Sequence, residues 1–162
     1  MLEVCDDVFE EQFLNYINYN IRDYSISWKI AMSTGTDPEY SFFLYYVDDK
    51  PEYKFILNEI FKKSKFLKDK KVKVKRQYIN LYPYGIGGKW HTDSEDPRNV
   101  TLLFFPCEWK PEYKGAILFK NGNKLEYKKN RFIIFQAELQ HKAEIHSNPM
   151  NRYTVAYKLE LN

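Results

Sequence analysis

Cysteine and histidine are scarce in this chain of 162 residues, which has two cysteines and three histidines. Two cysteines allow at most one disulfide, and the sequence has no Cys-x-x-Cys pair of the kind that binds structural zinc. The sequence therefore predicts a protein of a reducing, cytoplasmic compartment. No apolar run approaches the length of a membrane span, and the acidic start MLEVCDDVFEEQF lacks the apolar stretch of a signal peptide.

The chain also lacks a strong excess of charge of either sign, with 25 basic and 22 acidic residues and a net charge of +3. A balance this mild argues against a nucleic-acid partner. The basic run at 61–76 alternates with apolar residues, which is typical of a solvated helix end that leads into a strand.

Length and the absence of linkers or repeats predict one domain at 1–162. The lysine and asparagine content is typical of an AT-rich genome, such as a bacterial or phage genome.

Periodicity divides the chain into two parts. Apolar spacing predicts helices at 6–21, behind an aspartate cap, and at 51–67, behind a proline. Strands are expected at 27–34 and 40–47, joined by the turn GTDPE at 35–39. From residue 72 to 160, short β-rich runs follow one another, with a hairpin signal NGN at 121–123. We therefore expect a mainly β, α+β fold: a jelly-roll core at 72–160, supported by the helices and strands of 1–71.

The stretch WHTDSED at 90–96 places His91 and Asp93 two positions apart. With three histidines and nine aspartates, about 0.17 such pairs are expected by chance, so the pair alone is weak evidence for a metal site. In an extended segment, residues two apart point to the same side. His91 and Asp93 are therefore candidate ligands that need a third, and a surface turn is the alternative.

The third ligand can be chosen by strand alternation in HKAEIH at 141–146. His141 shares a face with an alanine and an isoleucine, whereas His146 shares its face with charged residues. The sequence therefore predicts that His141 points into the barrel and that His146 is exposed to solvent. Two imidazoles and one carboxylate form the facial arrangement suited to non-haem Fe(II), which leaves positions open for O₂ and a bidentate co-substrate.

An arginine is a further candidate site residue, in addition to the three metal ligands. In NRYTVAYKLEL, Arg152 lies on the smaller, more polar face of the strand, together with Thr154. A buried guanidinium requires an anionic partner, and its planar fork matches a carboxylate. An anionic ligand in the cavity is one interpretation, and a structural ion pair with Glu138 or Glu144 is the other.

Together, His91-Thr-Asp93, His141 and Arg152 resemble the signature of the Fe(II)/2-oxoglutarate-dependent oxygenases, most closely their prolyl 4-hydroxylase-like branch. The segments NLYPYGIGGKWHTDSED and NRFIIFQAELQHKAEIHSNPMNRYTVAYKL are similar to core strands of that branch, and the resemblance covers roughly residues 72–160. It implies a double-stranded β-helix, which is the jelly-roll arrangement already expected from the strand pattern.

The resemblance also implies roles. His91, Asp93 and His141 would bind Fe(II), Arg152 would hold the distal carboxylate of 2-oxoglutarate, and Thr154 would line that pocket. Tyr82 lies where the family often places an aromatic residue beside the co-substrate, although a core tyrosine is an equal alternative. The implied reaction uses O₂, with ascorbate as an optional supplement, to convert 2-oxoglutarate to succinate and CO₂ while hydroxylating an unactivated C–H bond. Peptidyl proline is the implied substrate, which gives a protein or peptide partner. Free amino acids and other protein side chains remain open as alternatives.

The sequence departs from the family at two positions and leaves two rival functions. Gly115-Ala116 stands where the family often has two glycines, and Phe104 stands where some members have a tyrosine that assists the arginine. A nucleic-acid demethylase of the same superfamily would resemble this ligand set but typically has a second arginine where this chain has Lys158. A barrel that binds zinc without catalysis is the other rival, and Arg152 argues against it because a closed structural site needs no anion receptor.

Overall fold

The structure, a computed structural model, describes residues 1–23, 25–32 and 41–162. Its elements, in chain order, are β1 (Glu3–Cys5), α1 (Glu11–Ile21), β2 (Lys29–Met32), β3 (Ser41–Tyr46), α2 (Pro51–Lys63), β4 (Val72–Tyr82), β5 (Asn99–Phe105), β6 (Ile117–Phe119), β7 (Lys124–Leu125), β8 (Arg131–Gln136), β9 (His141–Ala143) and β10 (Arg152–Leu161). None of the helices in these ranges is long and apolar enough to cross a membrane. The expected mainly β, α+β class is confirmed.

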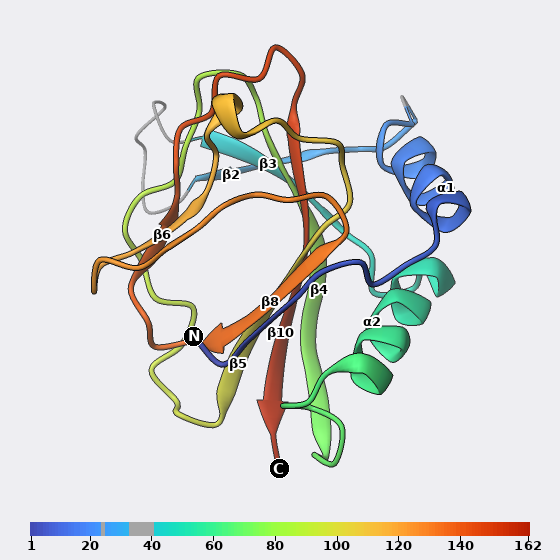
Figure 1. The fold of residues 1–162 in the computed structure, drawn as a ribbon, viewed down its shortest axis with the longest axis vertical. Coiled ribbons are helices and arrows are strands. Elements are labelled where there is room, and N and C mark those ends of the chain that lie inside the picture. The colour runs from blue at the N-terminus through green and yellow to red at the C-terminus, as the bar shows by residue number, and fades with distance from the viewer. Residues whose placement is uncertain (24, 33–40) are drawn as a thin grey trace.

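The strands form two antiparallel sheets. The large sheet has the order β1-β8-β5-β10-β4-β3-β2, and the small sheet has the order β7-β6-β9. Figure 1 shows the helices α1 and α2 on one side of the large sheet, and β6 of the small sheet on the other. The central strand β10 pairs with β4 and β5 along most of its length, so it is the axis on which both layers are assembled.

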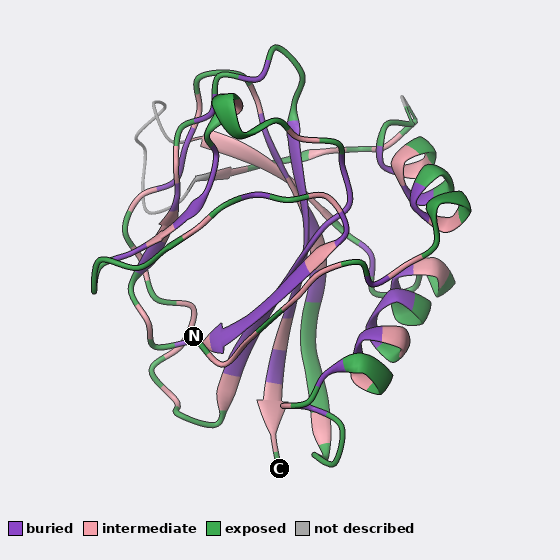
Figure 2. Cartoon of the chain, in the orientation of Figure 1, coloured by how far each residue is buried: buried purple, intermediate pink, exposed green. Residues whose placement is uncertain are grey.

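Side chains along β10 point alternately toward the helices and toward the small sheet, so this strand contributes to both layers of the fold. Tyr153, Val155, Tyr157 and Leu159 are buried toward the helices, and the hydroxyl of Tyr157 donates a hydrogen bond of 2.7 Å to the carbonyl of Tyr53 in α2. The alternate side chains point toward the small sheet and line a cavity there. Figure 2 shows that β5, β8 and β10 are buried along much of their length. Apolar core therefore fills both layers: between the large sheet and the helices, and between the two sheets, where Phe119 packs on Phe135 with ring centres 5.2 Å apart. The polar cavity lies within this second layer.

The start of the chain differs from the expected helix at 6–21. Helix α1 begins at Glu11, and β1 adds a short strand to the edge strand β8. The side chain of Asn130 accepts hydrogen bonds from the backbone N–H groups of Val8 and Phe9, at 3.1 and 2.9 Å. The expected aspartate cap is therefore wrong, because a distant asparagine binds this segment before the helix starts.

Other expectations from the sequence have mixed outcomes. The hairpin at NGN is confirmed, since β6 and β7 pair on either side of it. Helix α2 ends at Lys63 rather than at residue 67, and the turn expected at 35–39 lies outside the described residues. Strand β9 ends at Ala143 instead of continuing to residue 146.

Candidate functional site

Two imidazoles are brought together by a backbone bridge between His91 and His141. The N–H of His91 donates to the carbonyl of His141 at 3.1 Å, and the N–H of His141 donates to that of His91 at 2.9 Å. The ring centroids lie 4.4 Å apart. The pairing joins the segment before β5 to β9, so residues fifty positions apart in the sequence become neighbours.

Both imidazoles are oriented by local hydrogen bonds. The Nδ1 atom of His91 lies 2.8 Å from the carbonyl of Lys89, and the Nδ1 atom of His141 lies 2.8 Å from the carbonyl of Leu139. A carbonyl can only accept, so each Nδ1 carries a proton, and in the neutral ring this leaves the lone pair on Nε2. Burial lowers the pKa of His141 to about 4, so this ring is neutral at neutral pH. Neutral imidazoles held in this way are the form in which histidine binds metal ions.

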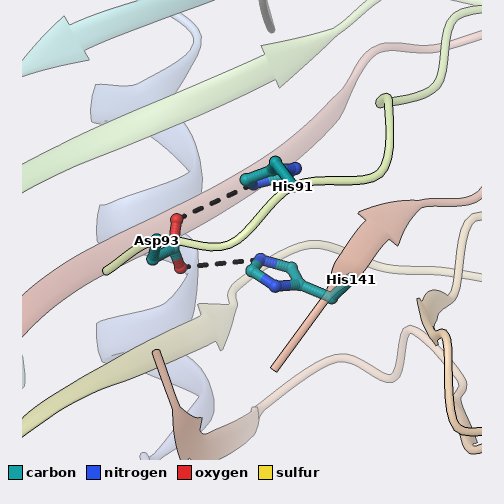
Figure 3. Close-up of side chains that lie close together, drawn as sticks. All are labelled: His91, Asp93 and His141. Atoms are coloured by element: carbon teal, nitrogen blue, oxygen red, sulfur yellow. Dashed lines mark ion pairs between the residues drawn. The ribbon is translucent and has the colours of Figure 1, made fainter. Parts of the chain in front are cut away.

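Asp93 faces both rings. One carboxylate oxygen, Oδ1, lies 3.7 Å from Nε2 of His91, and the other, Oδ2, lies 3.5 Å from Nε2 of His141 (Figure 3). The donor atoms of the three residues lie within 4.8 Å of one another. Two neutral nitrogens and one carboxylate oxygen around a common point form a donor set that could hold a divalent transition-metal ion.

The carboxylate of Asp93 is itself held by two side chains. Its Oδ2 accepts a hydrogen bond of 2.5 Å from the hydroxyl of Thr101 in β5 and an ion-paired hydrogen bond from the ammonium of Lys158 in β10. Burial raises the pKa of Asp93, but Lys158, His141 and Thr101 outweigh this effect and hold it well below its usual range. Asp93 is therefore ionised, and its Oδ1 has no such partner among the described residues.

The guanidinium of Arg152 is buried in the same cavity. Its Nε donates a hydrogen bond of 2.9 Å to the carbonyl of Gly115, and its carbon Cζ lies 5.4 and 5.2 Å from the ring centres of Tyr82 and Tyr127. Its Nη2 has no hydrogen-bond partner among the described residues, nor does the hydroxyl of Thr154. A buried donor is costly when unsatisfied, so these two groups indicate a site for an acceptor ligand.

The alternative ion pair of Arg152 is not present. Glu144 instead accepts a hydrogen bond of 3.1 Å from the backbone of Ala116 and lies 3.4 Å from Lys124, and no ion pair joins Glu138 to Arg152 within the described ranges. Gly115 has a φ of +81°, and a Cβ there would lie 3.3 Å from Arg152. The glycine therefore permits the turn whose carbonyl orients the guanidinium.

A cavity of about 240 Å³ contains both groups of residues. Tyr82 lines it, stacks on Phe42 with ring centres 4.7 Å apart, and keeps its proton because burial raises the pKa of its hydroxyl. The six residues selected from the sequence therefore lie around one cavity: His91, Asp93, His141, Arg152, Thr154 and Tyr82.

His146 was placed wrongly by the sequence. It is buried, with Nε2 3.0 Å from the carbonyl of Tyr82 and its ring 5.4 Å from that of Trp109, whereas Ile145 is 56% exposed. Alternation fails because β9 ends at Ala143, after which the chain turns. His146 is nevertheless absent from the cluster of candidate metal donors.

Sequence reasoning also missed residues on the inner face. Phe104 points to the helices and packs on Phe9 with ring centres 5.1 Å apart, so Leu103 is the β5 residue that lines the cavity. Alternation in RQYINLY predicts that one face of β4 carries the even-numbered residues from 76 to 82, and all four line the cavity. Applied to β4 and β5, the same rule would have identified Asn80 and Thr101.

Comparison of the sequence with known proteins gives no relative: no protein-family model and no curated sequence matches it. Comparison of the structure with solved structures does find similar proteins. A prolyl-4-hydroxylase from Pseudomonas putida aligns with a TM-score of 0.75 and 16% identity over 98% of this chain and 91% of that one. A prolyl hydroxylase from Trichoplax adhaerens, in complex with a peptide fragment of the hypoxia inducible factor oxygen degradation domain, aligns with a TM-score of 0.68 and 15% identity, over 98% and 82%.

A third similar structure is that of an epimerase rather than a prolyl hydroxylase. The epimerase SnoN, in complex with Fe³⁺, alpha ketoglutarate (2-oxoglutarate) and nogalamycin RO, aligns with a TM-score of 0.79 and 7% identity, over 97% of this chain and 77% of that one. The fold is thus the jelly roll of 2-oxoglutarate- and Fe(II)-dependent oxygenases, including prolyl 4-hydroxylases, and the His-x-Asp…His cluster is present in it.

Proposed function

We propose that this protein is an Fe(II)- and 2-oxoglutarate-dependent oxygenase that hydroxylates an unactivated C–H bond and releases succinate and CO₂. The proposal rests on one observation: a single cavity contains two distinct candidate binding sites, one for a metal ion and one for an anion. One is the donor cluster of His91, Asp93 and His141, and the other is the buried, partly unsatisfied guanidinium of Arg152. A structural metal site would require only the first.

The three donors fit Fe(II). Both imidazoles direct unprotonated Nε2 atoms toward the same region, and Asp93 is ionised. Thr101 and Lys158 occupy Oδ2 of Asp93, so Oδ1 is the oxygen available to the metal. These two residues would position the iron indirectly, by fixing the carboxylate of Asp93. Bound iron and co-substrate would supply the oxidative chemistry, and the protein would position them and exclude water.

The second candidate binding site fits 2-oxoglutarate. Arg152 would hold the distal carboxylate in a charge-assisted hydrogen bond, with Thr154 as a second donor. Arg152 lies over the rings of both Tyr82 and Tyr127, and the hydrogen bond from its Nε to Gly115 orients it. The protonated hydroxyl of Tyr82 is a further donor on the cavity wall.

Peptidyl proline is the substrate we propose first. The similarity to two prolyl hydroxylases supports it, one of them with a bound peptide. The similarity to SnoN supports testing free amino acids and other small molecules as alternatives. A nucleic-acid substrate is disfavoured by the net charge of +3 and by Lys158, whose ammonium pairs with Asp93.

Succinate formation tests the proposal. Purified protein with Fe(II), O₂ and ascorbate is expected to convert 2-oxoglutarate slowly to succinate, and Zn²⁺ should suppress the conversion. His141→Ala is the inactive control. Proline peptides incubated with the wild-type protein should gain the mass of one oxygen atom. If no metal loading yields succinate, the protein is a metal-binding barrel without this activity.

A further inference from the structure

Two cations lie opposite each other at one end of the cavity. Arg76 in β4 and Lys158 in β10 are direct cross-strand partners, and both side chains line the cavity that contains the iron-ligand candidates. Like charges directly opposite on one face of a sheet repel. Such a pair is expected where an anion lies between or beside the two charges.

Only one of the two cations has an anionic partner. Lys158 pairs with Asp93, the one acidic residue that lines the cavity within the described ranges. Arg76 makes no ion pair with any residue in those ranges, although acidic groups are close by in sequence and in the sheet. Glu160 pairs instead with Lys75 at 2.8 Å and with Arg98 at 3.5 Å. Lys75 and Arg98 are thus neutralised, by Glu160 and Asp96. Arg76 and Lys73 are both exposed and make no ion pair among the described residues, but only Arg76 of the two lines the cavity.

The sum of charges in the cavity, counted with Fe(II) and 2-oxoglutarate bound, supports the same conclusion. Bound Fe(II) and Arg152 would together balance Asp93 and the two carboxylates of 2-oxoglutarate, since imidazoles that bind a metal ion are neutral ligands. Lys158 and Arg76 then remain as cations in excess. A cavity with surplus positive charge favours a substrate that brings negative charge.

We propose that Arg76, with Lys158 behind it, receives a carboxylate of the substrate, and this inference rests on the proposed oxygenase function. The guanidinium presents a planar fork of donors that matches a carboxylate in two hydrogen bonds. The substrate is therefore an acidic one: either a peptide with an aspartate or glutamate beside the target residue, or a free amino acid bound through its own carboxylate. The neutralised lysine and arginine around Arg76 disfavour a track for successive phosphates.

Matched substrates provide the test. Proline peptides with aspartate or glutamate beside the proline are compared with their asparagine or glutamine counterparts, and free amino acids are compared with their amides. Calorimetry on anaerobic protein loaded with Fe(II) and 2-oxoglutarate gives the affinities, and mass spectrometry gives oxygen addition. We expect the carboxylate member to bind about tenfold tighter or better, the scale of one charge-assisted hydrogen bond. The peptide and amino-acid sets identify which source of carboxylate is used.

Three variants test whether Arg76 causes the preference for carboxylate over amide substrates. Arg76→Gln should remove it, Arg76→Lys should recover part of it, and Lys73→Gln, which removes an exposed charge from the same strand, should retain it. Equal use of carboxylate and amide members by the wild type, or a preference that survives Arg76→Gln, would overturn the inference. Tighter binding of a single-stranded oligonucleotide than of any carboxylate would also overturn it. Succinate formation by the wild type separates these results from a failure of the proposed function, which predicts succinate whatever the substrate.

Discussion

His91 and His141 exchange a pair of backbone hydrogen bonds, so the positions of their imidazoles are fixed by the main chain. Each ring is then oriented by a carbonyl two residues earlier. The main chain and local carbonyls thus position both rings without a contribution from a metal ion, which lowers the ordering cost of metal binding.

The metal ligands can be tested individually. His91→Ala, Asp93→Ala and His141→Ala are each expected to weaken Fe(II) or Co(II) binding by about a hundredfold or more, because two donors remain. His146→Ala should leave metal affinity nearly unchanged. It should lower the free energy of unfolding by about 2 kcal/mol, since a buried ring and its hydrogen bond are lost. Metal titration and thermal unfolding measure the two effects, and a His146 variant that loses metal while staying folded would contradict the assignment.

Lys158 allows a prediction about stability without metal. Lys158→Met leaves the buried carboxylate of Asp93 without its cation, which should destabilise the metal-free protein by about 3 kcal/mol. A divalent metal replaces the missing positive charge, so its addition should raise the unfolding temperature of Lys158→Met more than that of the wild type.

Lys75→Met is the matched control for Lys158→Met. It removes a half-exposed lysine from its pair with Glu160, which keeps Arg98 as a partner, so the change should cost less than about 1 kcal/mol and leave the response to metal unchanged. Equal stabilisation of all three proteins by metal would show that Lys158 does not compensate the charge of Asp93.

Strand alternation predicted the site where strands are long. In β10 it assigned Arg152 and Thr154 to the cavity, and the strand runs without a break through both positions. At β9 it was correct for His141 and wrong for His146, because the strand ends between them. Where a short strand ends depends on its partners, here β6 and the segment at His91, and those contacts are not encoded locally.

The support of Asp93 shows a second limit of sequence reasoning. Thr101 and Lys158 meet its carboxylate from two different strands, 8 and 65 positions away. Alternation gives the face of each residue but not the register between strands, which decides the pairs that meet. The class of fold and the donors could therefore be predicted. Alternation could also place Thr101 and Lys158 on the inner face, but it could not predict that both contact Asp93.

Arg152 decides whether the cavity is a co-substrate site. Arg152→Leu removes the buried guanidinium that the co-substrate assignment requires and keeps similar apolar bulk between Tyr82 and Tyr127. Loss of a buried, charge-assisted contact commonly costs about 2–5 kcal/mol, so affinity for 2-oxoglutarate should fall by roughly 30-fold or more. Arg152→Lys should recover only part of the loss because it lacks the planar fork. Anaerobic titration of the Fe(II)-loaded protein, followed by the metal-to-ligand charge-transfer band, measures this affinity. Fe(II) affinity should hardly change, since Arg152 is outside the donor cluster, and wild-type 2-oxoglutarate affinity in Arg152→Leu would refute the co-substrate assignment.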